Sequence, residues 1–254
     1  MSARRPRRHR VAVPGTDVVL EVDEWVDDGA RPSTTALFLP GFGSVRSGAK
    51  ATSLGIELAS RGARLLALDY EGHGGSTGSF ATLSVSRHLR DALAVIGALA
   101  PAPPLTVIGS SLGGLVAARA AAKLQPHVHR LALIAPAFGF RERFERRLGE
   151  AALEHWERTN VLRYSGEHFC AEIAFDLLRD ARTLDEDELA RAIDVPTLLV
   201  HGTDDVTVPI ECSLDVAKHW RAPLRFERIA GGDHRLESSL EQLTATIAEF
   251  VVAP

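Results

Sequence analysis

The sequence has little cysteine and no long apolar run. Its two cysteines, Cys170 and Cys212, lie far apart and in no CxxC spacing, which excludes a disulfide framework and a four-cysteine zinc site. No uninterrupted apolar run approaches the length of a membrane span. The net charge of -4 argues against a surface that binds nucleic acid. The 254 residues are 45% hydrophobic and 24% charged, which is typical of a soluble globular protein that needs neither disulfide nor metal for stability.

The N-terminus is strongly basic. The first ten residues carry five arginines and no acid, and no apolar segment follows that would make a secretory signal. A short transit peptide and a tail for an anionic partner are alternatives. We expect residues 1–10 to be a disordered, solvated tail before a single domain at residues 11–254, and the protein to be cytoplasmic.

Short apolar runs alternate with helical patterns along the rest of the chain. The runs predicted to be strands are Val18 to Val26, Thr35 to Leu39, Arg64 to Asp69, Leu105 to Gly109, Arg130 to Ala135, Thr197 to His201 and Leu224 to Ile229. The predicted helices are Gly48 to Ser60, Leu83 to Leu99, Leu112 to Leu124, Ile210 to Trp220 and Leu236 to Val252. The first run alternates in polarity, as in an antiparallel edge, whereas most others are continuously apolar. This pattern predicts an α/β fold with a mostly parallel sheet, helices on both faces and a site at the carboxyl ends of the strands.

One segment, at about residues 137–194, shows no strand pattern. Phe140, Phe144, Leu148, Ala152 and Trp156 recur at four-residue spacing, which predicts an amphipathic helix. Two further helices are predicted over Phe169 to Leu178 and over Glu186 to Ile193, the latter with Asp185 as its N-cap. We interpret the segment as a helical lid in which Phe140, Phe144 and Leu148 wall a substrate pocket. Ordinary packing on the flank of the sheet is the alternative.

Gly109-Ser110-Ser111-Leu112-Gly113 matches the pattern G-x-S-x-G. An apolar strand runs into it and a helix of small residues leaves it, which is the setting of a nucleophile elbow. The turn exposes the Ser111 hydroxyl at the N-terminus of a helix, whose dipole favours developing negative charge. A glycine-rich nucleotide loop would need a different glycine spacing. Ser111 is therefore the candidate nucleophile.

A serine nucleophile needs a base, and the base needs an orienting acid. His234 follows the last predicted strand, whereas His219 falls within a predicted helix and His201 ends a strand, so His234 is the candidate base. Asp204 and Asp205 both follow the preceding strand, and Asp205 is preferred because it fits H-G-x-x-D-x-x-V-P.

Two backbone N–H groups are needed to hold an oxyanion. One is expected from Leu112, directly after the nucleophile, and the other from Phe42 in the loop Leu39-Pro40-Gly41-Phe42-Gly43. His73 precedes Ser111 in the chain and is expected to fix a turn.

Five short sequence elements follow one another along the chain: P-G-F, D-Y-x-G-H-G-x-S, G-S-S-L-G-G, H-G-x-x-D-x-x-V-P and D-H-R. Their order is that of the α/β-hydrolase superfamily, which the chain resembles over nearly all its length past the basic tail. A narrower resemblance rests on three segments, Leu39-Pro40-Gly41, Gly109 to Gly114 and Asp233-His234-Arg235. They resemble the mitochondrial palmitoyl-protein thioesterase and acyl-glucuronide esterase branch and its bacterial relatives. Pro40 stands where many relatives have histidine.

The resemblance implies an eight-stranded α/β-hydrolase fold and a serine esterase that works through an acyl-enzyme on a small-molecule acyl ester. It implies no cofactor and no metal. An acyl-thioesterase on the same machinery and a non-catalytic binding protein with this fold are the alternatives. The acyl length and the oligomeric state are not given by the sequence.

Overall fold

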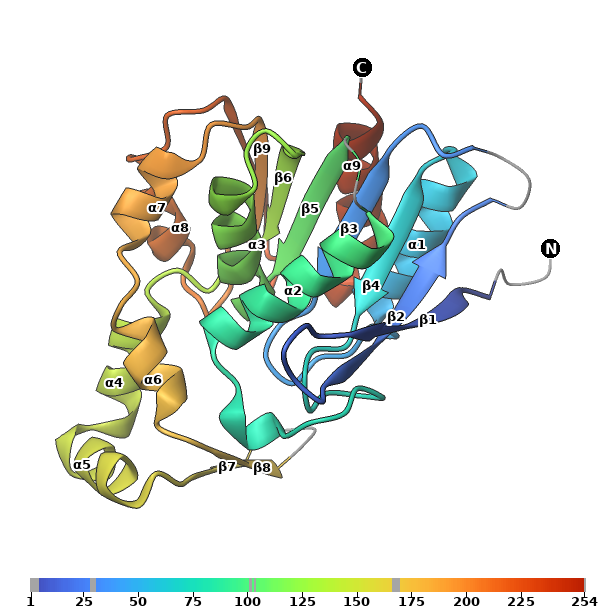
Figure 1. The fold of residues 1–254 in the computed structure, drawn as a ribbon. Helices are drawn as coiled ribbons and strands as arrows, with labels where there is room; N and C mark the ends of the chain where they lie inside the picture. The colour runs from blue at the N-terminus through green and yellow to red at the C-terminus, as the bar shows by residue number, and fades with distance from the viewer. Residues whose placement is uncertain (1–4, 28–30, 101, 103, 166–169, 254) are drawn as a thin grey trace.

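The structure, a computed structural model, describes residues 5–27, 31–100, 102, 104–165 and 170–253. Its centre is a sheet in the order β1-β2-β4-β3-β5-β6-β9-β10, so the mostly parallel eight-stranded sheet predicted from the sequence is confirmed (Figure 1). The strands are β1 (Arg7–Ala12), β2 (Val19–Trp25), β3 (Thr35–Leu39), β4 (Arg64–Leu68), β5 (Leu105–Ser110), β6 (Val128–Ile134), β9 (Thr197–Gly202) and β10 (Leu224–Ile229). Strand β2 pairs antiparallel with both β1 and β4, and the other neighbouring strands pair in parallel.

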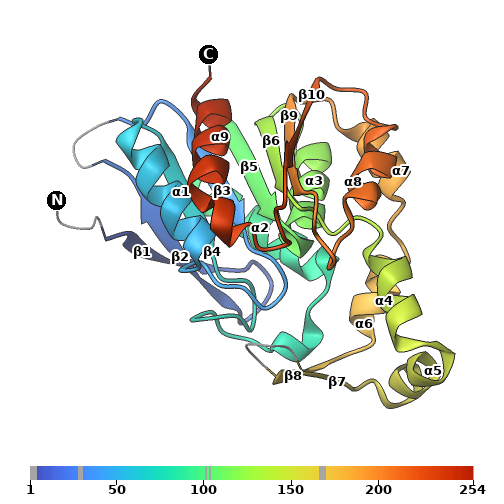
Figure 2. The same cartoon turned by 180° about the vertical axis from the view of Figure 1, so that it is seen from behind.

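Helices cover both faces of this sheet. Helices α1 (Ala49–Ser60) and α9 (Leu240–Val252) lie together on one face, and α2 (Val85–Leu99), α3 (Leu112–Lys123) and α8 (Ile210–Ala217) lie on the other (Figures 1 and 2). Each face buries its own apolar core against the central strands, which explains why those strands are continuously apolar. Within the described residues, no helix combines the length and apolar character needed to cross a membrane.

The prediction of a disordered tail at residues 1–10 is wrong for residues 7–10. Residues 1–4 lie outside the described residues, but Arg7–Ala12 form the edge strand β1, so β2 is not the edge that its alternation suggested. The register places Arg8 opposite Asp23 and Arg10 opposite Glu21. The Arg10 guanidinium is 3.2 Å from the Glu21 carboxylate. These arginines therefore pair with the acids of the neighbouring strand. The prediction of a solvated tail considered only their positive charge and not these partners.

The lid segment forms a cap between β6 and β9, and it contains a hairpin that the sequence did not predict. Its elements are α4 (Phe140–Leu148), α5 (Glu150–Thr159), β7 (Leu162–Ser165), β8 (Cys170–Ile173), α6 (Asp176–Ala181) and α7 (Glu186–Ala192). Strand β8 occupies the first half of the helix predicted over Phe169 to Leu178, and Phe169 lies outside the described residues. The long amphipathic helix is broken at Gly149, whose φ of 74° is left-handed. The Asp185 N-cap is confirmed, because its carboxylate accepts the Glu188 N–H at 2.8 Å.

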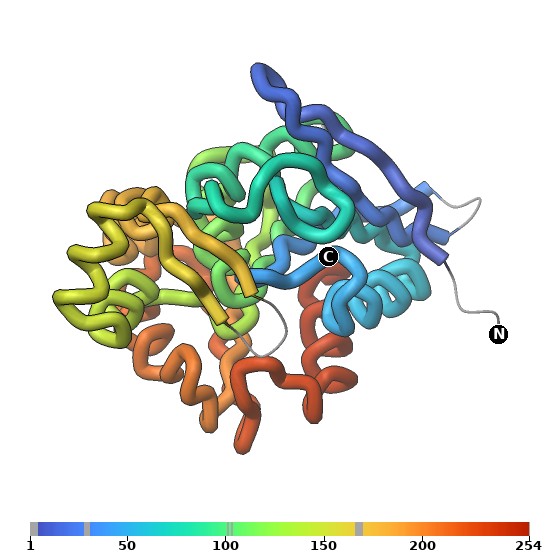
Figure 3. Tube along the Cα trace, turned by 90° about the horizontal axis from the view of Figure 1, so that it is seen from below, coloured from blue at the N-terminus to red at the C-terminus, as the bar shows by residue number. Residues whose placement is uncertain are grey.

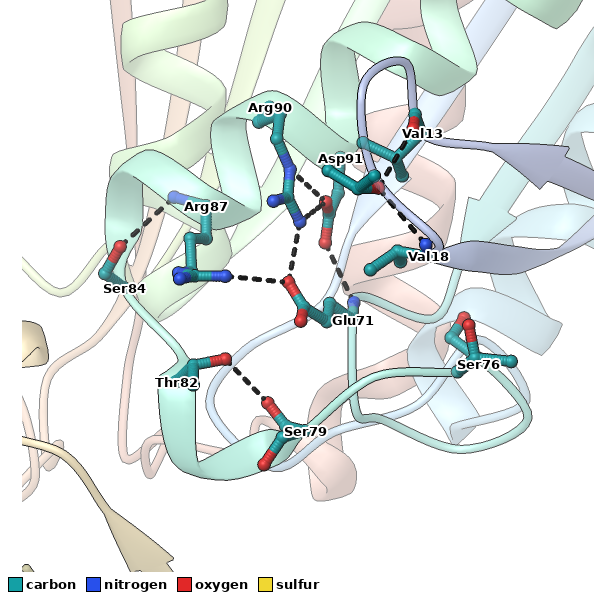
Figure 4. A network of polar contacts seen from close by, with 12 residues as sticks. Val13, Val18, Glu71, Ser76, Ser79, Thr82, Ser84, Arg87, Arg90 and Asp91 are labelled. Carbon is teal, nitrogen blue, oxygen red and sulfur yellow. Dashed lines mark hydrogen bonds and ion pairs between the residues drawn. The ribbon is translucent and has the colours of Figure 1, made fainter.

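The loop after β4 is fixed to helix α2 by a polar network (Figure 4). The Asp91 carboxylate accepts the Glu71 N–H at 2.8 Å, and the Arg90 guanidinium bridges Asp91 and the Glu71 carboxylate at 2.7 Å each. The same loop carries Phe80, whose ring packs edge-on against Phe42 with centroids 5.6 Å apart. The network therefore supports one side of the loop that follows β3.

A partly buried carboxylate joins the two ends of the cap. The Glu186 carboxylate, at the start of α7, accepts the N–H of Gly139 at the start of α4 at 2.7 Å. Burial, together with the nearby Glu142 charge, raises the pKa of Glu186 to about 7. The folded state therefore holds this proton more tightly than the unfolded chain, and the contribution of Glu186 to the free energy of unfolding falls as pH rises from about 4.5 through 7.

Replacing Glu186 by glutamine should remove this pH dependence while keeping an acceptor for Gly139. We expect E186Q to melt a few degrees above the wild type at pH 8.5 and close to it at pH 4.5, as measured by circular dichroism. An equal difference in melting temperature at both pH values would show that the carboxyl group does not titrate between them.

Candidate active site

Ser111 sits on a sharp turn between β5 and α3. Its φ of 53° and ψ of -120° are strained for a residue with a side chain, and the surrounding backbone holds the strain in place. The Ser111 N–H donates to the Ile134 carbonyl at 2.9 Å, and the Ser111 carbonyl accepts the Gly114 and Ala137 N–H groups at 2.8 and 2.9 Å. The sharp strand–turn–helix predicted around Ser111 is therefore present in the structure.

The glycines around Ser111 are required by close backbone contact. A Cβ at Gly109 would lie 2.2 Å from the Gly113 carbonyl oxygen, and a Cβ at Gly113 would lie 2.2 Å from that of Leu39. A Cβ at Gly41 would lie 3.1 Å from the Cβ of Ser111. The loop after β3 thus lies directly against the serine, where glycine allows the approach.

The structure brings Ser111, His234 and Asp205 together from three separate strand ends. His234 Nε2 is 3.0 Å from the Ser111 hydroxyl oxygen, and His234 Nδ1 is 2.7 Å from Asp205 Oδ2. The carboxylate accepts a hydrogen bond, so the proton of the neutral ring is on Nδ1 and Nε2 is free to accept the serine proton. This is the geometry that a serine, a general base and an orienting acid require.

Backbone contacts tie the loop of Asp205 to the loop of His234. The Asp204 N–H donates to the Gly232 carbonyl at 2.9 Å, and the Gly231 N–H donates to the Thr203 hydroxyl at 2.8 Å. A Cβ at Gly202 would lie 2.1 Å from the Gly232 oxygen, so the two loops touch here. The distance between the carboxylate and the imidazole is thereby fixed by the loops that carry them.

Asp205 is the buried member of the two candidate acids. Its side chain is 0% exposed, whereas Asp204 is exposed and accepts a hydrogen bond from the Thr203 hydroxyl. Burial disfavours the charge, but hydrogen bonds from His201, His234 and the Val208 N–H outweigh burial and hold the pKa of Asp205 well below its ordinary value. The carboxylate is therefore ionised near neutral pH, as an orienting acid must be.

The two expected oxyanion donors flank the serine. Leu112 is the first residue of α3, where a backbone N–H has no partner within its helix. Phe42 follows Gly41 in the loop that lies against Ser111. The placement of both residues fits the expected role.

A buried ion pair anchors the loop that carries Phe42. Asp69, at the end of β4, accepts the backbone N–H of Arg46 at 2.7 Å and also pairs with its guanidinium. The Arg46 Nε donates to Asp23 of β2 at 3.0 Å, and all three side chains are largely buried. Sequence reasoning missed this anchor, because an arginine in a glycine-rich loop gives no signal of the distant acids that it meets.

A cavity of about 500 Å³ opens beside Ser111 and His234. Phe42 lines it, and so does Tyr164 of the cap hairpin, whose ring packs edge-on against Phe42 with centroids 5.0 Å apart. Lys50, Arg235 and Glu237 also line it. Burial lowers the pKa of Lys50 although the nearby Glu237 and Asp233 favour its charge.

The predicted pocket wall of Phe140, Phe144 and Leu148 is wrong. None of the three lines the cavity beside Ser111 within the described part of the chain. The Phe144 ring instead packs on Phe140 and on the fully buried Trp156, with centroids 5.1 and 5.7 Å away. The apolar stripe is satisfied inside the cap, and the cap reaches the site through Tyr164 of the hairpin.

The chain is similar to several known proteins. The mouse palmitoyl-protein thioesterase ABHD10, a mitochondrial protein, is 27% identical over 226 residues, which are 85% of this chain and 74% of that protein. A protein of Agrobacterium vitis S4 assigned as a hydrolase has a crystal structure that aligns with 98% of this chain and 100% of its own, at 26% identity and a TM-score of 0.85.

Two further solved structures share the fold. Est1E of Butyrivibrio proteoclasticus with bound ferulic acid aligns at a TM-score of 0.84 and 22% identity, over 95% of this chain and 97% of its own. The mouse alpha/beta hydrolase domain-containing protein 10 aligns at a TM-score of 0.79 and 23% identity, over 96% of this chain and 98% of its own. The sequence profile of the alpha/beta hydrolase family matches residues 36–249, which include Ser111, Asp205 and His234. The chain therefore belongs to the alpha/beta hydrolase family.

Proposed function

We propose that this protein is a serine hydrolase that cleaves carboxylic esters through an acyl-enzyme, with Ser111 as nucleophile, His234 as general base and Asp205 as orienting acid. The observation that carries the proposal is the continuous contact from the Ser111 hydroxyl through both nitrogens of His234 to the buried Asp205 carboxylate. The strained turn at Ser111 and the cavity beside it add support.

The reaction follows from this geometry. His234 Nε2 takes the hydroxyl proton as Ser111 Oγ bonds to the substrate carbonyl carbon, and the carbonyl oxygen becomes an anion held by the N–H groups of Leu112 and Phe42. His234 then gives its proton to the leaving oxygen as the ester bond breaks, and the acyl group remains on Ser111. Water then attacks the carbonyl carbon of the acyl-enzyme while His234 takes its proton. His234 returns a proton to Ser111 Oγ as the acyl bond breaks, which releases the acid and restores the serine.

The residues that line the cavity include polar and aromatic side chains, and this favours one orientation of the substrate. The leaving group must lie beside His234, because this residue protonates it, and the residues next to His234 in the cavity are the polar Arg235 and Glu237. The acyl group then points toward Phe42 and Tyr164. Tyr164 belongs to the cap hairpin, which lies beside the loop that follows β3 (Figure 3). An aromatic wall favours acyl chains with apolar surface.

A thioesterase uses the same residues, and the thioesterase name of the mouse relative supports this second candidate. A panel of p-nitrophenyl esters and acyl-CoAs, each measured as kcat/KM, distinguishes the two. Labelling of Ser111 by a fluorophosphonate, located by peptide mass spectrometry, tests the shared machinery. An unlabelled protein that hydrolyses no member of the panel would instead support a non-catalytic binding protein with this fold.

Tyr164→Ala should flatten the dependence of the rate on acyl length. Each methylene buried against the wall is worth about 0.8 kcal/mol, or nearly fourfold in kcat/KM, and the variant lacks the cap side of that wall. We expect the octanoyl ester to lose about tenfold or more relative to the acetyl ester, since loss of a large aromatic wall affects several methylenes. The measurement is kcat/KM on acetyl, butyryl and octanoyl p-nitrophenyl esters.

Phe144→Leu is the matched control, because Phe144 belongs to the cap but packs inside it. It should lower the melting temperature and leave the chain-length dependence intact. A folded Tyr164→Ala variant with the wild-type chain-length dependence would remove the hairpin from the account of specificity.

A further inference from the structure

The Asp205 carboxylate contacts a second histidine. His201, at the end of β9, has its Nε2 3.2 Å from Asp205 Oδ2, the same oxygen that His234 Nδ1 contacts at 2.7 Å. The other oxygen, Oδ1, accepts the N–H groups of Thr207 and Val208 at 2.9 and 2.8 Å. Backbone donors thus hold one oxygen, and two imidazoles meet at the other.

The contacts of His201 define which of its nitrogens carries the proton. Nε2 faces two acceptors, Asp205 Oδ2 and the Val208 carbonyl at 2.8 Å, so Nε2 carries a hydrogen. Nδ1 lies 2.9 Å from the hydroxyl of Ser213 in α8, which can donate to it. A neutral ring protonated on Nε2 satisfies every one of these contacts, and both His201 and Ser213 are fully buried.

His201 is placed to hold both ends of the short loop that presents Asp205. The Nε2–H group touches the carboxylate at the start of the loop and the Val208 carbonyl three residues later. The ring is 0% exposed and is not among the described residues that line the cavity, so it acts on the reaction only through Asp205. The sequence showed His201 as the end of a strand and gave no sign of this contact.

We propose that His201, held by Ser213, is a positioning residue that aims Asp205 Oδ2 at His234. The inference rests on the proposed function and extends its hydrogen-bonded chain to Ser111, His234, Asp205, His201 and Ser213. When His234 takes the serine proton it becomes a cation, and Oδ2 must then stay in line with its Nδ1–H. A second donor on the same oxygen restricts rotation of the carboxylate away from that line.

The test compares two replacements of His201. Leucine fills a similar volume without a donor, whereas glutamine can place an amide N–H near the position of Nε2. We expect H201L to lower kcat about ten- to a hundredfold, as is typical when an outer partner of a functional side chain is lost, with KM nearly unchanged. We expect H201Q to stay within a few-fold of the wild type. Both rates are normalised to active sites titrated with a fluorophosphonate, so that unfolded protein does not count.

Proton NMR gives a readout that simple loss of packing would not move. The low-field resonance of the His234 Nδ1–H, which reports its hydrogen bond to Asp205, should shift or broaden in H201L and persist in H201Q. An unchanged kcat per titrated site in H201L, or an equal loss in both variants, would overturn the positioning role.

Ser213→Ala keeps the inference testable if H201L does not fold. Without the hydroxyl donor, His201 can also carry its proton on Nδ1 and then no longer donates to Asp205. We therefore expect kcat to fall several-fold with KM unchanged. A wild-type kcat in this variant overturns the inference. His219→Leu is the control, because His219 pairs with Asp187 at 3.4 Å at the surface and should leave kcat unchanged. Failure of the proposed function would look different, since the wild type itself would then neither be labelled nor hydrolyse an ester.

Discussion

Replacing Ser111 by alanine is expected to lower kcat at least about 10⁴-fold on every ester that the protein hydrolyses. The substitution removes the only atom that bonds to the substrate carbon in the proposed reaction. The remaining rate over that in water would come from the oxyanion donors and from binding in the cavity. Stability should change little, because alanine keeps the Cβ, and the backbone contacts that hold the strained turn involve only the main chain.

The measurement is kcat and KM on p-nitrophenyl butyrate, with the melting temperature as a check on folding. Ser110→Ala is the neighbouring control for kcat, because Ser110 lines the cavity but is not part of the hydrogen-bonded chain that joins Ser111, His234 and Asp205. Near wild-type turnover by a folded Ser111→Ala variant would show that another group attacks the ester.

Asp205→Asn should lower kcat by about 10⁴-fold, the second-largest effect that the structure implies. The carboxylate accepts hydrogen bonds on both oxygens, from His234 and His201 on one and from two backbone N–H groups on the other. An amide in its place must present its NH₂ group to one pair of these donors. His234 then loses either its orientation or the tautomer that leaves Nε2 able to accept the serine proton.

The same substitution should also lower stability near neutral pH. A carboxyl group whose pKa is lower in the folded state stabilises the fold above its unfolded pKa, and this contribution is lost as pH falls through the folded value. Asp205→Asn should therefore melt below the wild type at pH 7, with a difference that shrinks in strong acid. Asp204→Asn is the control, since Asp204 is exposed. A larger loss of kcat in Asp204→Asn would transfer the orienting role to that residue.

The sequence predicted well those parts of the fold whose sequence pattern depends only on neighbouring residues. The central strands are buried on both faces, so their apolar runs are continuous and visible without knowledge of their partners. The cap hairpin is different, because strand β7 (Leu-Arg-Tyr-Ser) and strand β8 (Cys-Ala-Glu-Ile) are short, mixed in polarity and paired only with each other. Strand β1 was missed because its arginines are compensated by acids that come 11 to 15 residues later in the chain, Glu21 for Arg10 and Asp23 for Arg8.

The candidate site divides in the same way. Ser111, Asp205 and His234 each follow a strand and stand in short patterns, so their meeting at one edge of the sheet could be expected from the order of elements. Tyr164 and Arg46 act through contacts with residues far away in the chain, which no local pattern encodes. His201 contacts Asp205 only four residues later, but the sequence pattern that contains both residues does not show that contact. The acyl wall was assigned to the wrong part of the cap for a related reason, since an apolar stripe shows that a face is buried but not what buries it.

The arginine-rich edge strand β1 has a consequence for how copies of this protein meet. An exposed edge strand carries unpaired backbone groups and is a template for aggregation by strand addition. A second copy that docked antiparallel along β1 would bring the Arg8 and Arg10 side chains of both chains alongside each other. Each contacts an acid of β2, but the two side chains are still 74% and 68% exposed, and burying these charged groups against their like opposes that pairing. The arginines that looked like a loose tail in the sequence thus disfavour edge-to-edge growth at the β1 edge of the sheet.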